Sequence, residues 1–349
     1  MTVEPLLPAA ARPAPNEYAA LKRLVAECGL LEPQPAYYGA KVAGTLGLLA
    51  AGLAAVRLLG ATPRLWPLVP AAAFLAFVYT QIGFIAHDIG HRALLRTSRA
   101  RDAAALVFGN LLLGISRSWW LEKHNAHHSH PNQVDADPDI DIPIVAFSEE
   151  EARRKRGLAR LITKYQAAIL FPLMFAIGAP SWRLYSVQEV MWHRPRFALV
   201  EGLLLVVHFI WYFGLVFASL GLRRGLLFMG LHQGLMGLYM GSVFAPNHKG
   251  MLVLEKDSQM DFLRQQVLTS RNVRPSAFHD FWYGGLNYQI EHHLFPSMPR
   301  NRLGEARAIA KAFCARQDIP YHETGMLQSF KEVLQFMHHV SAPLRRPDA

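Results

Sequence analysis

Residues 65–91 read LWPLVPAAAFLAFVYTQIGFIAHDIGH, an apolar block that ends on two histidines, His87 and His91. A helix rises about 1.5 Å per residue, so about 20 apolar residues cross a hydrocarbon core about 30 Å thick. The block, residues 65–86, therefore predicts a membrane-spanning helix. At the i, i+4 spacing of HDIGH the two imidazoles share one helix face, which makes the end of this helix half of a metal site.

Three further apolar blocks of similar length follow the same pattern, at residues 42–59, 202–222 and 226–246. Hydrophobic residues make up 52% of the chain and charged residues only 18%, which departs from an ordinary soluble composition. The short sequences GATPR and RRG separate the blocks of each pair, so each pair forms a helical hairpin. We predict an all-α integral membrane protein with four transmembrane helices in two hairpins. Buried helices of a soluble protein are the alternative, which four such blocks disfavour.

Polar sequence separates and follows the hairpins, at residues 87–195 and 247–349, and contains most of the 36 Lys and Arg residues. The positive-inside rule then places both segments and both termini in the cytoplasm, where we expect a helical cap that holds a di-metal site. Residues 1–15 lack a charged start followed by an apolar run, so they indicate a disordered lead-in and no signal peptide. Residues 16–349 are expected to form one membrane domain.

Two shorter apolar segments, residues 103–115 and 166–180, are too short to cross a membrane. We expect them to be re-entrant or interfacial. Trp119 and Trp120 follow the first segment, and an interfacial aromatic belt is the simplest interpretation of them. The last apolar block has the spacing of a helix-packing face at three glycines, Gly234, Gly237 and Gly241.

Net charge and cysteine content narrow the class of function. The net charge is +10 and the pI about 9.7, but no basic run carries interleaved aromatic residues, so nucleic acid is not an expected partner. A basic face suits an anionic lipid leaflet, an acidic electron-donor protein or the phosphates of an acyl thioester. Two distant cysteines, Cys28 and Cys314, exclude a disulfide framework and a cysteine-ligated zinc or iron–sulfur site.

Histidines recur in three further motifs. HNAHH repeats the one-face spacing, QIEHH adds an adjacent pair, and PNHKG places a histidine where the last apolar block ends. Eight converging imidazoles are more than one ion binds, so we expect two metal ions. The predicted ligands are His87, His91, His124, His127, His128, His248, His292 and His293.

The metal and its surroundings can be narrowed from the residue types. Imidazole suits zinc, copper, iron and nickel, whereas structural zinc usually takes some thiolate. Two nitrogen-ligated ions at a membrane suggest dioxygen chemistry on iron. Asp88, Asn125 and Glu291 adjoin the clustered histidines and are candidates to accept an imidazole N–H and fix its tautomer. The alternating aspartates from Asp135 to Asp141 are either similar partners or part of a solvated loop.

Other histidines serve as controls for this interpretation. His338 and His339 are adjacent, but no partner cluster accompanies them, and we expect a solvated helix end. His232 precedes His248 by 16 residues, which is about 24 Å along a helix. It cannot join the same site, and we expect it to make an interhelical hydrogen bond.

With these residues assembled, the chain resembles the membrane fatty-acid desaturases. Their pattern is HxxxH, HxxHH and (H/Q)xxHH on four membrane helices with a cytoplasmic cap, and HDIGH, HNAHH and QIEHH match the three boxes in order and spacing. The context GGLNYQIEHHLFPSMPRNRL is most similar to the front-end subfamily, of Δ5 or Δ6 type, in which glutamine replaces the first histidine of the third box. The resemblance covers nearly the whole chain after about residue 16.

The resemblance assigns the eight histidines, position by position, to a di-iron centre with dioxygen as co-substrate. Gln289 takes a place that histidine holds in other members, and Asn247 adjoins His248, so both are expected to contact metal directly or through water. No HPGG haem motif of a fused cytochrome b5 domain occurs, so electrons are expected from a separate ferredoxin or cytochrome b5 with its reductase. The Ala- and Arg-rich composition suggests a GC-rich bacterial gene and hence the bacterial inner membrane.

The implied reaction removes hydrogen from two neighbouring methylenes of an acyl-CoA or acyl-lipid and leaves a cis double bond. A hydroxylase or ketolase acting on a lipid or carotenoid is an alternative on the same scaffold, which the three boxes do not exclude. A histidine-rich membrane metal transporter is a more distant alternative, because a transporter would place its ionisable ligands in the middle of its spans.

Overall fold

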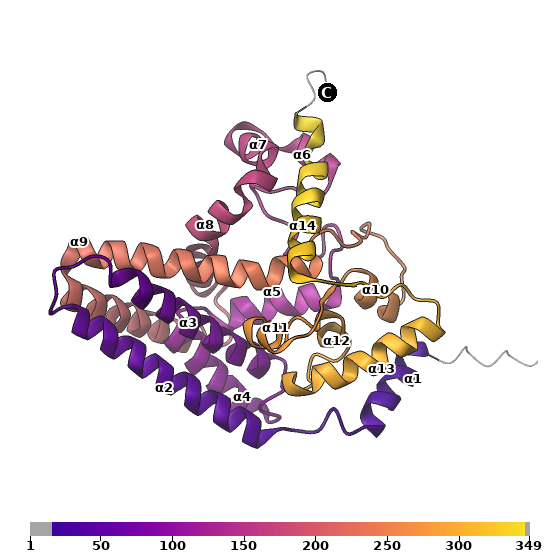
Figure 1. Cartoon of the computed structure of the whole chain (residues 1–349), viewed down its shortest axis with the longest axis horizontal. Coiled ribbons are helices and arrows are strands. Elements are labelled where there is room, and N and C mark those ends of the chain that lie inside the picture. Colours follow the sequence, from indigo (N-terminus) through magenta and orange to yellow (C-terminus); the bar gives the residue numbers. More distant parts are fainter. Residues whose placement is uncertain (1–15, 346–349) are drawn as a thin grey trace, which may run out of the picture.

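The computed structural model describes residues 16–345, which are mostly helical (Figure 1). Residues 1–15, for which the sequence predicts a disordered lead-in, lie outside the described residues. Four helices are long and apolar enough to cross a membrane. They are α2 (Pro35–Leu59), α3 (Leu68–Gly90), α8 (Gln166–Gln188) with its π-helical continuation η2 (Glu189–His193), and α9 (Ala198–His248).

Shorter elements fill the segments between and after the long helices. Before α9 lie α1 (Glu17–Glu27), α4 (Ser98–Ala105), the π-helix η1 (Leu106–Leu113), α5 (Arg117–Ser129), α6 (Glu149–Arg154) and α7 (Gly157–Lys164). After it lie α10 (Phe262–Leu268), β1 (Asn272–Val273), α11 (Ala277–Trp282), α12 (Gln289–Leu294), η3 (Arg300–Arg302), α13 (Leu303–Arg316), β2 (Glu323–Thr324), α14 (Met326–Val340) and η4 (Ala342–Leu344). The two strands pair in parallel and form the only sheet among the described residues.

The helix α9 contains both of the predicted C-terminal spans, joined at a sharp break. Gly221 has φ 69° and ψ 177°, a left-handed conformation that interrupts the helix and that glycine adopts without strain. Across the break the Tyr212 hydroxyl contacts His232 Nδ1, so the two arms of α9 lie against each other. The hydrogen bond expected for His232 is therefore confirmed. Arg224 also donates to the main-chain oxygen of Leu59, which brings the break beside the end of α2.

The helix α8 departs from the sequence expectation. Residues 166–180 were expected to be a short interfacial segment within a polar stretch, but the helix with η2 extends to His193 and is apolar enough to count as a candidate span. Pro172, Pro180 and Arg183 interrupt the apolar run and make the segment look shorter in the sequence. Most of its apolar side chains are uncovered within the protein, as expected for a helix in contact with lipid.

The crossing of α8 and α9 depends on the three glycines of α9, so the predicted helix-packing face is confirmed. A Cβ atom at Gly237 would lie 2.4 Å from the main-chain oxygen of Met174, and one at Gly234 would lie 2.5 Å from the Phe175 ring. At Gly241 it would lie 2.5 Å from the Met174 sulfur. Only residues without a side chain let the two backbones approach this closely.

A bend of 107° between α4–η1 and α5 turns the chain inside the apolar half. Residues 103–115 are predicted to be re-entrant or interfacial; a re-entrant loop has this geometry, and a broken span has the same form. His208 Nδ1 and Trp211 Nε1 contact the Leu111 carbonyl oxygen at 2.9 and 3.3 Å, and Arg183 donates to the Leu113 oxygen at 3.0 Å. These contacts satisfy carbonyl groups that hydrocarbon could not solvate.

The other side of the bend is held by a buried carboxylate. Glu201, near the start of α9, accepts hydrogen bonds from the Ser116 hydroxyl at 2.6 Å and the Ser118 hydroxyl at 2.5 Å. It also accepts one from the main-chain N–H of Ser118, at the N-terminus of α5, where a negative charge is favoured by the helix dipole. The bend therefore fixes the start of the helix that carries the HNAHH motif.

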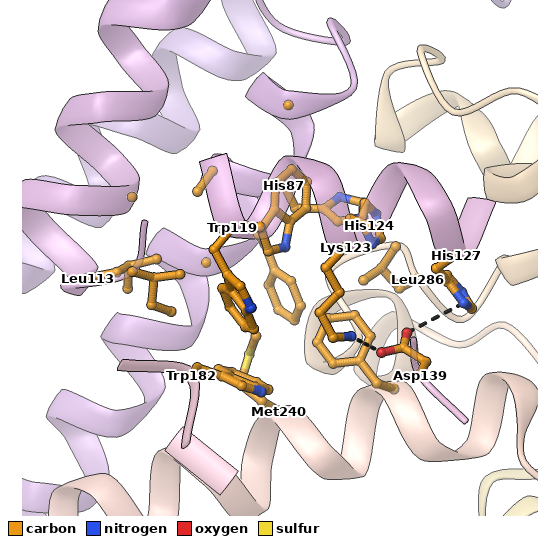
Figure 2. A pocket seen from close by; sticks show the side chains of 18 of the residues that line it. His87, Leu113, Trp119, Lys123, His124, His127, Asp139, Trp182, Met240 and Leu286 are labelled. Atoms are coloured by element: carbon orange, nitrogen blue, oxygen red, sulfur yellow. Dashed lines mark hydrogen bonds and ion pairs between the residues drawn. The ribbon is translucent and has the colours of Figure 1, made fainter. Parts of the chain in front are cut away.

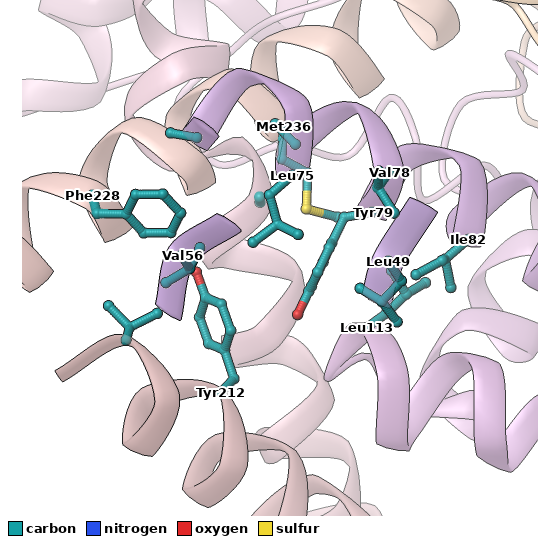
Figure 3. Packing of buried hydrophobic residues seen from close by; sticks show 14 of the residues in the cluster. Leu49, Val56, Leu75, Val78, Tyr79, Ile82, Leu113, Tyr212, Phe228 and Met236 are labelled. Atoms are coloured by element: carbon teal, nitrogen blue, oxygen red, sulfur yellow. The ribbon is translucent and has the colours of Figure 1, made fainter. Parts of the chain in front are cut away.

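The two largest of six apolar clusters in the described part of the chain support these elements. The larger one joins α2, α3 and α9, and Figure 3 shows Tyr79 and Tyr212 packed among Leu75, Phe228 and Met236. The second joins α1, α10, α12 and α13, which are grouped at one end of the molecule in Figure 1. The QIEHH motif lies on α12, so the second group of helices, α1, α10, α12 and α13, positions this motif.

Candidate metal centre

Five histidines from three helices form one compact group. His87 and His91 lie at the end of α3, His124 and His128 on α5, and His292 on α12, and their ligand nitrogens all lie within 4.8 Å of one another. The Nε2 atom of His124 is 2.8 Å from that of His91 and 3.1 Å from that of His128. His292 Nε2 lies 3.1 Å from His128 Nε2. The structure thus gathers the first box, most of the second and part of the third.

A second group holds the three remaining histidines of the predicted set. His127 of α5, His248 at the end of α9 and His293 of α12 are all buried, with ligand nitrogens within 4.8 Å of one another. His127 Nε2 lies 3.3 Å from His248 Nε2. The groups are adjacent, because the rings of His128 and His293 stack with centroids 4.2 Å apart. All eight predicted residues therefore meet in one place and divide into five and three.

The spacing and chemistry of these groups fit two metal ions. Nitrogen ligands bind zinc, and ions of similar size, at about 2.0–2.1 Å, so nitrogens of one coordination sphere are about 3 Å apart when adjacent and about 4 Å apart when opposite. The Nε2–Nε2 separations given above, from 2.8 to 3.3 Å, are those of adjacent ligands. Among the described residues, His87 Nε2 and His293 Nε2 are buried without a hydrogen-bond partner, and so are His208 Nε2 and His232 Nε2, so the convergence of several nitrogens and not a single unpaired one indicates a metal site.

The protonation of the rings also suits metal ligation. Burial, reinforced by the neighbouring imidazoles, holds the pKa values of five histidines well below their usual range. They are His91, His124, His128, His292 and His293. These rings are therefore neutral at pH 7, and neutral imidazole is the form that binds a metal.

The outer nitrogens of four ligand rings have partners that orient them. His127 Nδ1 lies 3.0 Å from both carboxylate oxygens of Asp137, and His87 Nδ1 lies 3.4 Å from Asp88. His248 Nδ1 lies 3.0 Å from the main-chain oxygen of Thr269, and His293 Nδ1 lies 2.8 Å from Gln266 Oε1. A ring held at Nδ1 by an acceptor donates its proton there and keeps Nε2 free for a metal.

Of the three residues predicted to accept a hydrogen bond from a ligand imidazole, one does so in the structure. Asp88 does contact a ligand ring, and Arg300 holds it by donating to its other oxygen at 2.5 Å. Asn125 is exposed and makes no described contact with a ligand histidine, so its expected role is wrong. Glu291 is also misassigned, because it accepts from the Asn272 amide at 2.7 Å and the Tyr321 hydroxyl at 2.8 Å instead. Asn125 and Glu291 are next to ligand histidines in the sequence, but neighbouring residues of a helix point in different directions.

The four alternating aspartates from Asp135 to Asp141 have two different environments. Asp137 is buried against His127, and Asp139 lies 3.4 Å from the same ring nitrogen. Asp135 pairs with Lys256 at an exposed position, and Asp141 is exposed. Both interpretations that the sequence left open therefore apply, each to part of the run. No sequence pattern pointed to Gln266 and Thr269, which act from a different helix and its end.

Gln289 and Asn247 lie at the edge of the three-histidine group. Gln289 Nε2 is 2.9 Å from His248 Nε2, and Asn247 donates to Gln289 Oε1 at 2.9 Å and to the Leu286 carbonyl at 3.1 Å. Both side chains are buried. The amide of Gln289 is therefore within reach of the group, and Asn247 sets its orientation.

The electrostatics around α12 include one strongly perturbed acid. Burial raises the pKa of Glu291 to about 7, against the hydrogen bonds from Asn272 and Tyr321, which favour the ionised form. The carboxyl group thus changes charge near neutral pH. It lies in the helix that carries His292 and His293, although it contacts neither ring.

A cavity of about 270 Å³ adjoins the histidines. Figure 2 shows His87, His124 and His127 along it, with Leu113 and Trp182 on the side away from Asp139. Trp119 and Trp120 also line the cavity, and the Trp120 ring stacks on His124 at 4.5 Å between centroids. The two tryptophans therefore face the cavity, which the sequence did not favour, and their place in an interfacial belt stays a prediction. An apolar channel that passes the two histidine groups can hold an extended hydrocarbon chain beside them.

The sequence is similar to a known protein family and to several characterised relatives. The family described as fatty acid desaturase matches residues 64–325. The Delta(6)-fatty-acid desaturase fat-3 of Caenorhabditis elegans is 31% identical over 345 residues, which cover 94% of this chain and 76% of the relative. The Delta(5) fatty acid desaturase fat-4 of the same organism is 29% identical over 95% of this chain and 76% of its own length. The acyl-lipid (9-3)-desaturase of Physcomitrium patens is 28% identical over 93% of this chain and 63% of its own.

These relatives come from eukaryotes, so they lend no support to a bacterial origin.

Proposed function

The chain belongs to the fatty acid desaturase family, and from that premise we propose that it is an oxygen-dependent acyl desaturase with a histidine-ligated di-iron centre. It introduces a cis double bond near the carboxyl end of an acyl chain carried by coenzyme A or a lipid. The observation that carries this proposal is the convergence of eight histidines in groups of five and three, with two members of each group lining one apolar cavity. Relatives named as Delta(5), Delta(6) and Delta(8) desaturases support the position of the double bond.

The proposal assigns one ion to each histidine group. His87, His91, His124, His128 and His292 hold the first, and His127, His248 and His293 hold the second, with Gln289 and Asn247 beside it. Bound iron supplies the activation of dioxygen that removal of hydrogen from an unactivated methylene requires. No side chain does this as an acid or a base, because an alkyl C–H has no usable acidity.

The residues of the cavity position the substrate and exclude water. Trp119, Trp120 and Met240 form apolar walls close to the ligand histidines, so a chain in the cavity presents its methylenes to the centre. A dry wall also protects reactive species from side reactions with water. Asp88, Asp137 and Gln266 fix the ligand rings from outside, so the geometry at the centre is set before substrate binds.

The path of the chain supports a two-hairpin topology. The ends of α3 and α9 meet at the histidines, and the break at Gly221 returns α9 to the side on which it began. The connection from α3 to α9 therefore starts and finishes on one side, which assigns α8 to the membrane interface. The centre, the cap and both termini are then on the side that the positive-inside rule makes cytoplasmic. A separate ferredoxin or cytochrome b5 donates electrons there, drawn by the net charge of +10.

Product analysis tests the proposal. The chain is expressed in a host that lacks this activity and is supplied with defined fatty acids, and double-bond positions are determined by mass spectrometry. We expect a new cis alkene close to the carboxyl end. A hydroxylated product without an alkene would replace the desaturase by the hydroxylase alternative. A new alkene near the methyl end would retain the desaturase but overturn the proposed position.

A further inference from the structure

The ligand His248 is the last residue of α9, where the helix itself does little to fix the chain. The last four C=O groups of an α-helix find no N–H donor within the helix, and in α9 they include those of Pro246 and Asn247. Both residues are buried, so their main-chain oxygens need a partner from elsewhere in the protein. Lys249, which follows His248, already has an extended conformation. The position of His248 therefore depends on contacts from another segment.

Arg271, in the segment between α10 and α11, supplies those contacts. Its Nε atom donates to the main-chain oxygen of Pro246 at 2.7 Å, and its Nη2 atom donates to that of Lys249 at 2.9 Å. Its main-chain N–H donates to the oxygen of Asn247 at 2.8 Å. One residue thus binds the main chain on both sides of His248. A cation at this place also suits the negative end of the dipole of α9.

The same short segment orients the ring of His248. The main-chain oxygen of Thr269 lies 3.0 Å from His248 Nδ1, and Thr269 precedes Arg271 by two residues. All four residues from Thr269 to Asn272 are 0% exposed. Thr269 therefore sets the direction of the imidazole, while Arg271 holds the main chain from which the ring extends.

The burial of Arg271 is not explained by an ion pair alone. Its side chain is 0% exposed, and Nη1 donates to the Glu332 carboxylate of α14 at 2.6 Å. Gln328 also donates to Glu332, at 3.1 Å, and His322 Nε2 lies 3.0 Å from it. A buried ion pair adds little net stability, because removal of both charges from water offsets their attraction. The specific use of this guanidinium is its contacts with the two main-chain oxygens beside His248.

We propose that Arg271 is a positioning residue for the metal ion of the three-histidine group. It holds the main chain around His248, so that His248 Nε2 stays directed toward His127 and His293. Among the described contacts, Arg271 reaches no member of the five-histidine group, so its effect is confined to one of the two ions. This inference rests on the proposed function, because it assumes that each group holds an ion.

Metal binding to the purified full-length protein tests this role without requiring turnover. The apoprotein is titrated anaerobically in detergent with ferrous iron, and a dissociation constant is obtained for each ion. His128→Ala and His248→Ala identify the two ions, because each variant removes a ligand from one group only. We expect Arg271→Met to raise the dissociation constant of the ion in the three-histidine group about tenfold or more, as is usual for residues that orient ligands. The other constant should not change.

Two further substitutions separate positioning from a general effect on the fold. Arg271→Lys keeps the charge and one donor group, so it should recover part of the affinity for the same ion. Glu332→Gln removes the charged partner but leaves Arg271 in contact with Pro246 and Lys249. It should raise the dissociation constant less than Arg271→Met does. An equal effect of Glu332→Gln and Arg271→Met would assign the loss to the ion pair and would contradict the proposed role.

Arg345 provides a matched control. It also donates to two main-chain oxygens, those of Lys164 at 3.3 Å and His338 at 2.5 Å, but neither residue adjoins a ligand histidine. Arg345→Met should leave both dissociation constants unchanged. A selective loss at the three-histidine group in this variant as well would show that the effect does not depend on contact with the end of α9.

The remaining outcomes separate the inference from the proposed function. Equal weakening of both ions, or of neither, would overturn the role of Arg271. If Arg271→Met shows no thermal unfolding transition, the decision passes to Arg271→Lys, which must weaken the ion of the three-histidine group alone. A wild-type protein that binds two ions and forms no alkene would contradict the proposed function. Selective weakening by Arg271→Met in that protein would still support the positioning role.

Discussion

His208 and His232 in the membrane half are as completely buried as His127 and His293 in the metal centre, yet the two pairs have different surroundings. His208 Nδ1 contacts a backbone carbonyl of the bend before α5, and His232 Nδ1 contacts the Tyr212 hydroxyl. Neither belongs to a described group of three or more potential ligands. In the metal centre, each ring lies close to several others, and four of the rings have a hydrogen-bond acceptor at Nδ1.

The comparison shows that burial alone does not identify a ligand histidine. His208 completes a turn of the backbone inside the apolar half, and its ring lies so close to Gly114 that a Cβ there would be 2.4 Å away. A lone histidine of this kind satisfies polar groups of the fold. Convergence of several Nε2 atoms, with acceptors at Nδ1, is what distinguishes the metal centre.

Removing a ligand should have the largest effect. We expect His128→Ala or His292→Ala to abolish desaturation and to lower bound iron, because each removes a nitrogen from the five-histidine group. Fatty-acid analysis and metal content measure the two effects, and membrane insertion should be retained. His232→Phe is the matched change in the membrane half and should keep both iron and activity. If His232→Phe lost iron as well, the distinction between the two sets of histidines would fail.

Removing an orienting acceptor should have the next largest effect. Asp137→Ala leaves His127 Nδ1 without its nearest acceptor, and such changes typically cost 10- to 100-fold in metal affinity or activity, about 1–3 kcal/mol. Metal titration of the apoprotein measures this directly. Asp135→Ala removes an exposed carboxylate from the same run and should have no effect. Equal losses in both variants would show that the run acts through its charge and not through His127.

The membrane half should respond in stability more than in chemistry. Gly237→Val places side-chain atoms against the backbone of α8, where even a Cβ would be 2.4 Å from the Met174 oxygen. We expect the free energy of unfolding to fall by about 1–3 kcal/mol. Thermal unfolding in detergent measures this loss. Gly230 has open space beside it, with no atom within 4 Å of the point where a Cβ would lie, so Gly230→Ala should be neutral or slightly stabilising. An equal loss at both glycines would contradict the close crossing of the two helices.

Glu291 on α12 should make the stability of the protein depend on pH. Its pKa is about 7 in the folded protein against 4.5 ordinarily, so folding favours its protonated form. Its favourable contribution is present in full below pH 4.5 and is lost as pH rises through 7. Relative to Glu291→Gln, the wild type should lose about 1–3 kcal/mol of stability between about pH 5 and pH 8. Parallel pH profiles of the two melting temperatures would show that this carboxyl group does not change charge there.

The smallest effect is expected at His338. It is exposed on α14, outside both histidine groups. His338→Ala should change neither iron content nor product yield, measured as for the ligand variants. A clear loss of activity would mean that adjacency of histidines, as in His338–His339, carries more information than their convergence.

Much of the site could be predicted because its parts are local in sequence. HDIGH and HNAHH lie on single helices, where the i, i+3 and i, i+4 spacings fix which rings share a face. The apolar blocks give the helix lengths, because hydrocarbon thickness sets them. The length of α8 was less predictable, since Pro172 and Pro180 resemble helix ends in the sequence but lie inside the helix.

The sequence by itself determined which histidines could act and where the chain is apolar enough to enter a membrane. Only the tertiary structure decided the division into five and three, the partners Gln266 and Thr269, and the place of Trp120 at the cavity. The reason is physical. Helix periodicity and bilayer thickness act within one segment, whereas these contacts join separate segments of the chain and depend on how whole helices pack.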